Sequence, residues 1–205
     1  MKVNSFDCFY FAANFPRFGA WSVDLSVKSS KKMLSGKVKI SDGLNLDGYV
    51  VLAEKALSGD EYFISPFKTN AVMPAKNFYA SSRYIATHIA SAIGVQLASC
   101  PDVPSMKFTI QETDSPLSVL ASFCVSLGAN FIFADNGALS IVVPSKSVTA
   151  YKGKYRLVDR GPKGLVTLGL DAFDLRPSHT LEGRKLGAVS YVSTADSTRA
   201  IAVFL

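Results

Sequence analysis

The feature that most constrains the fold is the spacing of apolar residues, which changes twice along the chain. Over residues 21–28 and again over 37–40, apolar and polar residues alternate. Alternation places every second side chain on the same side of an extended strand, so one side is buried and the other is exposed. Short apolar runs at 49–52 and 62–64 add further strands, with turn residues between them. The first 75 residues are therefore predicted to form a small barrel or sandwich.

Residues 76–146 change to helical spacing. Ile85, Ile89 and Ile93 recur at the interval that places them on one face of a helix, with Ala92 beside them. A serine at 81 or 82 can cap this helix, and a glycine at 94 can end it. After a strand at 107–110, the start signal at 114–116 predicts a second helix that ends at a glycine, residue 128. Its predicted apolar face is Leu117, Leu120, Ala121, Cys124 and Leu127.

The end of this middle segment carries a hairpin signal, and the last segment returns to strands. Asn136 and Gly137 lie between apolar runs at 130–134 and 138–143, which predicts a tight β-hairpin. Strands are then predicted at 155–158, 165–168, 187–192 and 200–204. The predicted fold class is α+β, mainly β: two small β-barrel-like domains, 1–75 and 147–205, with an α+β insertion domain, 76–146, between them. The pattern leaves open whether the flanks are separate β domains or one barrel split by an insertion.

Composition and charge exclude several classes of protein. Hydrophobic residues make up 48% of the 205 residues and charged residues 19%, which is typical of a globular chain. No apolar run approaches the roughly 18 residues of a membrane span, so no stable membrane insertion is predicted. Asp7 interrupts the only candidate leader, so a cleaved signal peptide is not expected. Three cysteines, Cys8, Cys100 and Cys124, predict no disulfide framework and favour folding in a reducing cytoplasm. Cys124 is expected in the core.

The basic excess is unevenly distributed. The net charge is +6, and residues 147–205 carry 9 basic and 5 acidic residues, whereas residues 76–146 carry 4 of each. Such an excess marks either a solvated surface or contact with nucleic acid or an acidic partner. Lys28, Lys31 and Lys32 form a short cluster with the same two interpretations. No aromatic residues lie between these lysines, so a stacking platform for single strands is not predicted.

No catalytic, cofactor or metal site is predicted, and the chain is not expected to be an enzyme. His88 is expected on a helix surface, and His179 lies in a loop beside Ser178 with no base or orienting group implied. Asp171 and Asp174 are interpreted as solvated loop carboxylates. The Gly-x-x-Gly spelling at 161–164 is interpreted as a hairpin turn, because strand-like residues flank it. The aromatic residues of the first segment belong either to the core or to a subunit interface: Phe6, Phe9, Tyr10, Phe11, Phe15 and Phe18.

The order of elements over residues 80–205 resembles the central and closing segments of phage tail baseplate hub proteins. The similar features are a strand at 108–110, a helix from Ser115 to Gly128, a hairpin of the form D-x-G-x-L-x-I at 135–141, and a Pro-containing loop at 175–183. A closing strand of G-x-V-x-x-V type follows, matched by Gly187, Val189 and Val192. The family includes late-control D type tail proteins and the hub domain of type VI secretion spikes.

The resemblance implies a structural virion protein of the tail, folded and assembled in the host cytoplasm. It implies a homotrimer whose two barrel-like domains per chain make a six-unit ring, adapting a sixfold tail tube to a threefold spike. The implied partners are a tail tube or distal tail protein on one side and a spike or tip protein on the other, with contact to passing DNA. No small-molecule substrate and no cofactor are implied.

Other classes stay open at this point. Residues 115–133 are also similar to the short N-terminal domain of secretins, which form larger rings. That family needs a signal peptide, and its short domain leaves the flanking strands unexplained. An enzyme or a nucleic-acid-binding module is a further alternative; an enzyme should show a pocket of convergent titratable groups, and an RNA binder a steep salt dependence.

Overall fold

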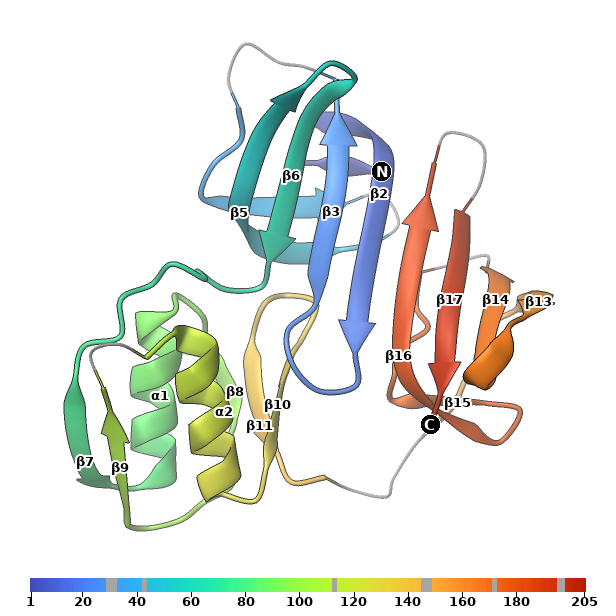
Figure 1. The fold of residues 1–205 in the computed structure, drawn as a ribbon. Coiled ribbons are helices and arrows are strands. Elements are labelled where there is room, and N and C mark those ends of the chain that lie inside the picture. Colours follow the sequence, from blue (N-terminus) through green and yellow to red (C-terminus); the bar gives the residue numbers. More distant parts are fainter. Residues whose placement is uncertain (29–32, 42–43, 112–113, 145–148, 171–172, 195–197) are drawn as a thin grey trace. The chain divides into compact units, whose positions relative to one another are not determined.

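A computed structural model describes residues 1–28, 33–41, 44–111, 114–144, 149–170, 173–194 and 198–205. The chain divides into two compact units (Figure 1). The barrel unit contains Met1–Arg17, Trp21–Ile64 and Lys146–Leu205, and the helical unit contains Phe18–Ala20 and Ser65–Ser145.

The first part of the barrel unit is a closed six-stranded barrel. Its strands are β1 (Lys2–Val3), β2 (Phe6–Pro16), β3 (Ser22–Val27), β4 (Lys37–Ser41), β5 (Leu46–Ala56) and β6 (Gly59–Ser65). They are hydrogen-bonded in the order β1-β4-β5-β6-β3-β2, and β2 returns to β1. In β3, whose apolar and polar residues alternate, Val23, Leu25 and Val27 point inward and are at most 1% exposed. The barrel interior is therefore filled by side chains.

The same sheet continues beyond the barrel into the C-terminal segment. After β2, the sheet continues in order with β16 (Arg184–Ser193), β17 (Thr198–Phe204), β14 (Leu165–Leu170) and β13 (Tyr155–Arg160). Two short strands lie off this path: β15 (His179–Leu181) pairs with β16, and β12 (Thr149–Ala150) pairs with β15. One edge of β2 is shared, because its first residues pair with β1 and its last six with β16. The two flanks of the chain therefore form one continuous sheet, one part of which closes on itself. This architecture confirms the predicted mainly β fold with barrel-like domains.

An aromatic cluster holds β16 against the loop before β15. Tyr191 lies edge-on to Phe15 with ring centroids 6.0 Å apart and contacts Phe173 at 5.2 Å. Its hydroxyl donates a hydrogen bond of 2.8 Å to the carbonyl oxygen of Leu175. The Arg176 guanidinium lies 4.3 Å from the centroid of the Phe15 ring. Since Tyr191 is 1% exposed and Phe15 belongs to β2, this cluster fastens the two parts of the sheet together.

The helical unit contains α1 (Ser82–Ala92) and α2 (Pro116–Ser126) with short strands around them: β7 (Lys76–Ala80), β8 (Leu97–Ser99), β9 (Met106–Ile110), β10 (Asn130–Phe133) and β11 (Leu139–Val142). Ser81 caps α1 by accepting a hydrogen bond from the Tyr84 amide, as the sequence predicts. The three predicted isoleucines of the α1 face are fully buried. Strands β10 and β11 form the predicted antiparallel hairpin around Asn136.

The predicted apolar face of α2 is partly wrong. Leu117 is 45% exposed and Ala121 is also exposed, whereas Val119 and Phe123 are buried together with the correctly predicted Leu120 and Cys124. Apolar residues occur almost all round this helix, so their spacing does not fix its rotation. The Phe123 ring, which contacts Phe108 of β9 edge-on at 5.1 Å, supplies the largest buried surface and decides which face turns inward.

No helix in the described part of the chain has both the length and the hydrophobicity that crossing a bilayer requires.

Candidate functional site

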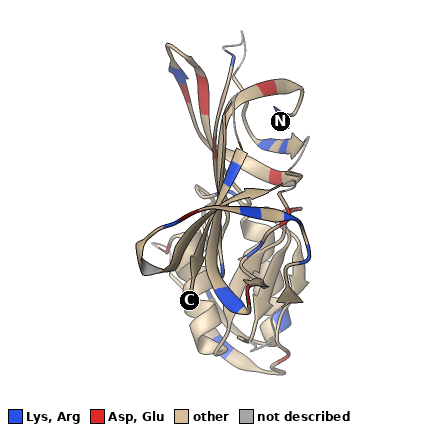
Figure 2. Ribbon diagram, turned by 90° about the vertical axis from the view of Figure 1, so that its right-hand side faces the viewer, with Lys and Arg blue, Asp and Glu red and all other residues tan. Residues whose placement is uncertain are grey.

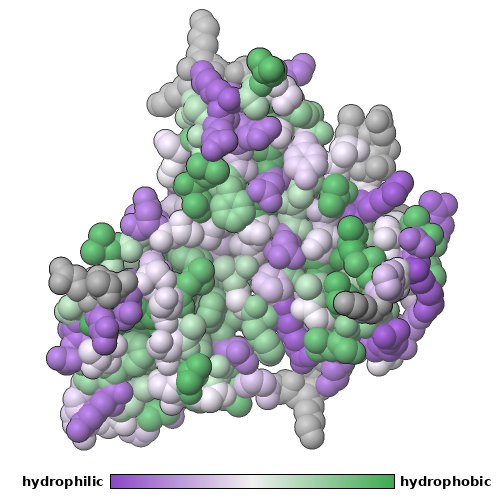
Figure 3. Space-filling model, viewed as in Figure 1, coloured by the Kyte–Doolittle hydropathy of each residue, from purple (hydrophilic) through white to green (hydrophobic). Residues whose placement is uncertain are grey.

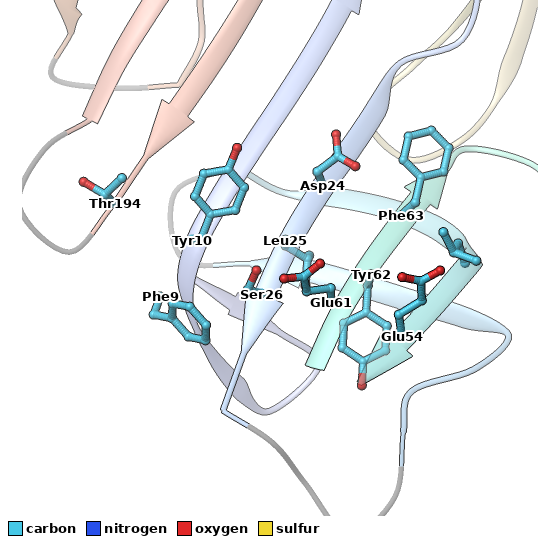
Figure 4. A pocket seen from close by; sticks show the side chains of 11 residues that line it. Phe9, Tyr10, Asp24, Leu25, Ser26, Glu54, Glu61, Tyr62, Phe63 and Thr194 are labelled. Carbon is cyan, nitrogen blue, oxygen red and sulfur yellow. The ribbon is translucent and has the colours of Figure 1, made fainter. Parts of the chain in front are cut away.

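A groove of about 540 Å³ lies on the outer face of the barrel wall formed by β2, β3, β6 and β5 (Figure 4). Its walls combine aromatic rings with carboxylates. The side chains that give it this character are Phe9, Tyr10, Asp24, Glu54, Glu61 and Phe63. On the face of the molecule drawn in Figure 3, hydrophobic and hydrophilic side chains are likewise mixed over β3, β5 and β6.

Strand register brings these side chains together. Tyr10 pairs with Ser26, and Ser26 pairs with Glu61, so these three form a row across β2, β3 and β6. In the neighbouring row Asp24 pairs with Phe63. These residues alternate with the buried ones of the same strands, so the alternation that fills the barrel also places this set outside.

A β-bulge widens the aromatic end of the groove. The register between β2 and β3 shifts between Cys8 and Tyr10, which leaves Phe9 as the extra residue. Phe9 and Tyr10 are 38% and 37% exposed. The Phe9 ring occupies the space beside Gly59, at the start of β6, where a side chain would otherwise lie.

The electrostatics of the groove favour a cation. Its lining, as far as the structure describes it, contains Asp24, Glu54 and Glu61 but no lysine or arginine. Burial raises the pKa of Asp24 above its usual value, because desolvation penalises the charged carboxylate. An arginine side chain can stack on an aromatic ring while it pairs with a carboxylate. The groove is therefore suited to a basic side chain from a partner.

Only part of the predicted aromatic run belongs to the core. Phe11 and Phe15 are at most 4% exposed and belong to the core, whereas Phe9 and Tyr10 line the groove. Asp24, Glu54 and Glu61 were not predicted as site residues from the sequence. The available signal was their position on the polar side of alternating strands, but that signal is shared by every solvated strand residue.

His179, which the sequence places in a loop, is instead the first residue of β15, and hydrogen bonds connect it to the loop that precedes it. The Nδ1 atom of His179 accepts a hydrogen bond of 3.0 Å from the Arg176 amide, and burial lowers the pKa of His179. Asp174 is exposed in this loop as predicted, and it also accepts a hydrogen bond of 2.6 Å from the Tyr151 hydroxyl. Asp171 lies outside the described residues. Ser178 belongs to the same loop, where its carbonyl accepts from the Thr149 amide.

The remaining predicted residues are distributed over both units. The Gly-x-x-Gly segment forms the turn between the antiparallel strands β13 and β14, which confirms the hairpin interpretation. Lys28 is exposed at the end of β3, and Lys31 and Lys32 lie outside the described residues. Cys124 is buried as predicted, and burial raises its pKa to about 12. Among the described residues, no three His, Cys, Asp or Glu side chains lie together as a metal site requires.

His88 differs from the expected surface histidine. It lies on α1 with its ring 5.1 Å from the Phe78 ring, and its buried Nε2 atom has no hydrogen-bond partner among the described residues. Burial lowers the pKa of His88, and the nearby Lys76 charge lowers it further. The folded helical unit therefore favours neutral His88.

Acid is expected to destabilise the helical unit through His88. Because the folded pKa of His88 lies below the ordinary 6.5, the unfolded chain binds the proton first as pH falls below 6.5. The free energy of unfolding should decrease from about pH 7.5 to about pH 5.5, in the range where histidine titrates. Urea unfolding across this range measures the slope. A His88→Asn variant should show a shallower slope than the wild type, and an unchanged slope would contradict the assignment.

Comparison with known proteins gives a match at the level of structure only. No protein-family model and no curated protein sequence matches the chain. Among solved structures, the 43 kDa tail protein of prophage MuSo2 from Shewanella oneidensis matches with a TM-score of 0.68 at 11% identity, over 100% of this chain and 96% of that chain. The tail protein from Neisseria meningitidis MC58 matches with a TM-score of 0.64 at 12% identity, over 97% and 92% of the two chains.

A third similar structure comes from a secretion system. A component of the type VI secretion system of E. coli, described as structurally similar to the T4 bacteriophage tail proteins gp27 and gp5, matches with a TM-score of 0.69 at 10% identity. The match covers 100% of this chain and 77% of that chain. The chain therefore has the fold of phage tail proteins and of a tail-like secretion component. This finding supports the predicted resemblance to phage tail proteins in general, without singling out the baseplate hub.

Proposed function

We propose that this chain is a structural subunit of a phage-type tail, in the baseplate hub where a sixfold tail tube meets a threefold spike. The observation that carries the proposal is the fold match over the whole chain to a phage tail protein and to a tail-like secretion component. The sequence resemblance over residues 80–205 supports the hub in particular. The proposed place is the tail of the assembled particle.

The sheet architecture supports an assembly of three copies. One chain supplies a closed barrel and an open extension of the same sheet, joined through β2 and β16. Three chains would supply six such parts, which matches a sixfold tube, while the threefold axis matches a spike. The proposed partners are accordingly a tube or distal tail protein on one side and a spike or tip protein on the other. In such a ring, the basic excess of the chain would suit a lumen through which DNA passes.

The proposed role is structural and involves no enzyme reaction, substrate or cofactor. The groove combines carboxylates with aromatic side chains on a sheet surface, a composition suited to contact with another protein. The role proposed for this surface is therefore assembly.

The native mass of the purified chain tests the proposal. We expect a mass near three times 22.0 kDa by native mass spectrometry or light scattering, and ring-shaped particles by negative-stain electron microscopy. A ring of about a dozen copies would instead favour the secretin-like alternative, since closed rings of many copies arise from a different rotation between subunits. A chain that stays monomeric at high concentration would contradict the homotrimer.

A further inference from the structure

The strand at the far end of the barrel unit's sheet has an open edge. β13 pairs with β14 and with no other described strand, so one row of its backbone groups faces away from the sheet. All six residues of β13 are exposed. Tyr155, Leu157 and Val158 are 39%, 39% and 44% exposed, an unusual density of apolar surface for an unprotected edge. Exposed edges of this kind are places where another chain attaches.

The same edge is basic. Lys152, Lys154 and Arg156 lie on or directly before β13 and are exposed. Arg156 and Lys154 line a shallow depression beside the strand, together with Tyr155. Arg160, at the other end of the strand, already forms an ion pair of 3.1 Å with Glu182. The basic residues of this edge that are not in an ion pair with Glu182 therefore lie at the start of β13. Figure 2 marks the basic and acidic residues along the ribbon.

The groove and this edge are complementary. The groove presents Asp24, Glu54 and Glu61 around exposed aromatic rings, and its described lining contains no cation. The start of β13 presents Lys154 and Arg156 beside Tyr155 in the shallow depression. Opposite charges combined with apolar contact give both orientation and affinity at an interface.

The two surfaces lie on different sides of the junction within one continuous sheet. In the order β5-β6-β3-β2-β16-β17-β14-β13, the groove occupies the first four strands and β13 is the last. Three strands, β16, β17 and β14, separate the groove strands from β13. A contact between two different patches of the same chain is heterologous, and it closes into a ring when the rotation between copies allows closure.

We infer that the basic edge strand β13 of one copy packs against the acidic aromatic groove of a second copy, with Arg156 directed at the Glu61 and Asp24 carboxylates. This inference rests on the proposed assembly of copies and names the surfaces that would make it. The groove holds only a few side chains, so it anchors a contact that must extend over neighbouring surface to reach the size of a stable interface.

Reciprocal charge reversal tests this contact. Glu61→Lys and Arg156→Glu, each alone, should weaken self-association of the full chain at least about tenfold, as expected for like charges placed in contact. The two changes together should restore the wild-type dissociation constant to within about threefold, because the opposite charges meet again. Mass photometry over a dilution series at low salt measures all three variants and the wild type.

Matched variants control for net charge and folding. Asp7→Lys and Lys37→Glu make the same charge changes at exposed positions of β2 and β4 outside the groove, and they should leave association unchanged. Glu61→Gln, which removes the charge without reversing it, should give a smaller loss than Glu61→Lys. Circular dichroism of each variant checks that the fold is kept.

The outcomes separate this inference from the proposed function. If the wild type is trimeric and the single reversals have no effect, or the double variant is as weak as the two losses combined, this contact is wrong and the trimer stands. If the charge swap restores association but the particles contain another number of copies, the contact stands and the threefold hub fails. A wild type that never associates overturns both.

Discussion

Replacing Gly59 with alanine is expected to destabilise the barrel unit by about 3 kcal/mol or more. Gly59 has a φ of +154°, which side-chain-bearing residues rarely adopt. A Cβ atom at this position would overlap the carbonyl oxygen of Val27 and approach the Phe9 ring to 2.9 Å. The ring can move, but the carbonyl belongs to the backbone of a paired barrel strand. The substitution must therefore distort the barrel wall and displace Phe9 from the groove.

Gly36→Ala is the matched control for this change. Gly36 also has a positive φ, +69°, but a Cβ atom there would meet nothing within 4 Å. Gly36→Ala should therefore lower the free energy of unfolding only by the backbone strain, about 1 kcal/mol. Urea unfolding followed by intrinsic tryptophan fluorescence compares the two variants, since the chain has one tryptophan, Trp21, which is buried in the barrel unit. Equal losses of stability would show that overlap at Gly59 is relieved without cost.

Replacing Tyr191 with alanine is expected to cost about 4 kcal/mol, in the range for large aromatic residues removed from a core. The side chain is 1% exposed and contacts both Phe15 and Phe173. Because Tyr191 pairs with Ala13 of β2 on one side and with Ala200 of β17 on the other, the cavity would open where the barrel joins the rest of the sheet. We therefore expect self-association to be lost together with stability.

The Tyr191→Phe variant distinguishes the contribution of the ring to stability from that of the hydroxyl. The hydroxyl donates to the Leu175 carbonyl, which also accepts a hydrogen bond of 3.0 Å from Arg176. Since that carbonyl keeps a donor, the phenylalanine variant should lose only about 1 kcal/mol and should still associate. Denaturant midpoints and native mass of both variants provide the measurements. If the phenylalanine variant is as unstable as the alanine variant, the stabilising contribution of Tyr191 comes from the hydrogen bond and not from ring packing.

Much of the fold could be predicted from the sequence because its signals are local. The alternating residues of 21–28 became β3, with Val23 and Leu25 inside the barrel. Asn136 with Gly137 became the turn between β10 and β11, where the Asn136 side chain accepts from the Ala138 amide. Turn geometry, capping and strand alternation are set by neighbouring residues, so one stretch of chain suffices to recognise them.

The candidate site could not be predicted, because its residues are brought together by register. Asp24 and Glu61 occupy ordinary polar positions of separate strands, and only the pairing of Asp24 with Phe63 and of Ser26 with Glu61 places them in one groove. Phe9 is a groove residue because a bulge occurs opposite Val27. No residue of β2 by itself predicts that bulge.

The sequence by itself determined the two helices, most of the longer strands and which residues of the alternating strand β3 lie inside, but it did not indicate β2 or the short strands β1, β7, β8, β12 and β15. Only the tertiary structure decided the rotation of α2, the closure of the barrel and the sharing of the β2 edge between β1 and β16. The physical reason is the range of the interactions. Alternation and capping act over a few residues, whereas strand pairing and the burial of a ring such as Phe123 depend on partners far away in the chain.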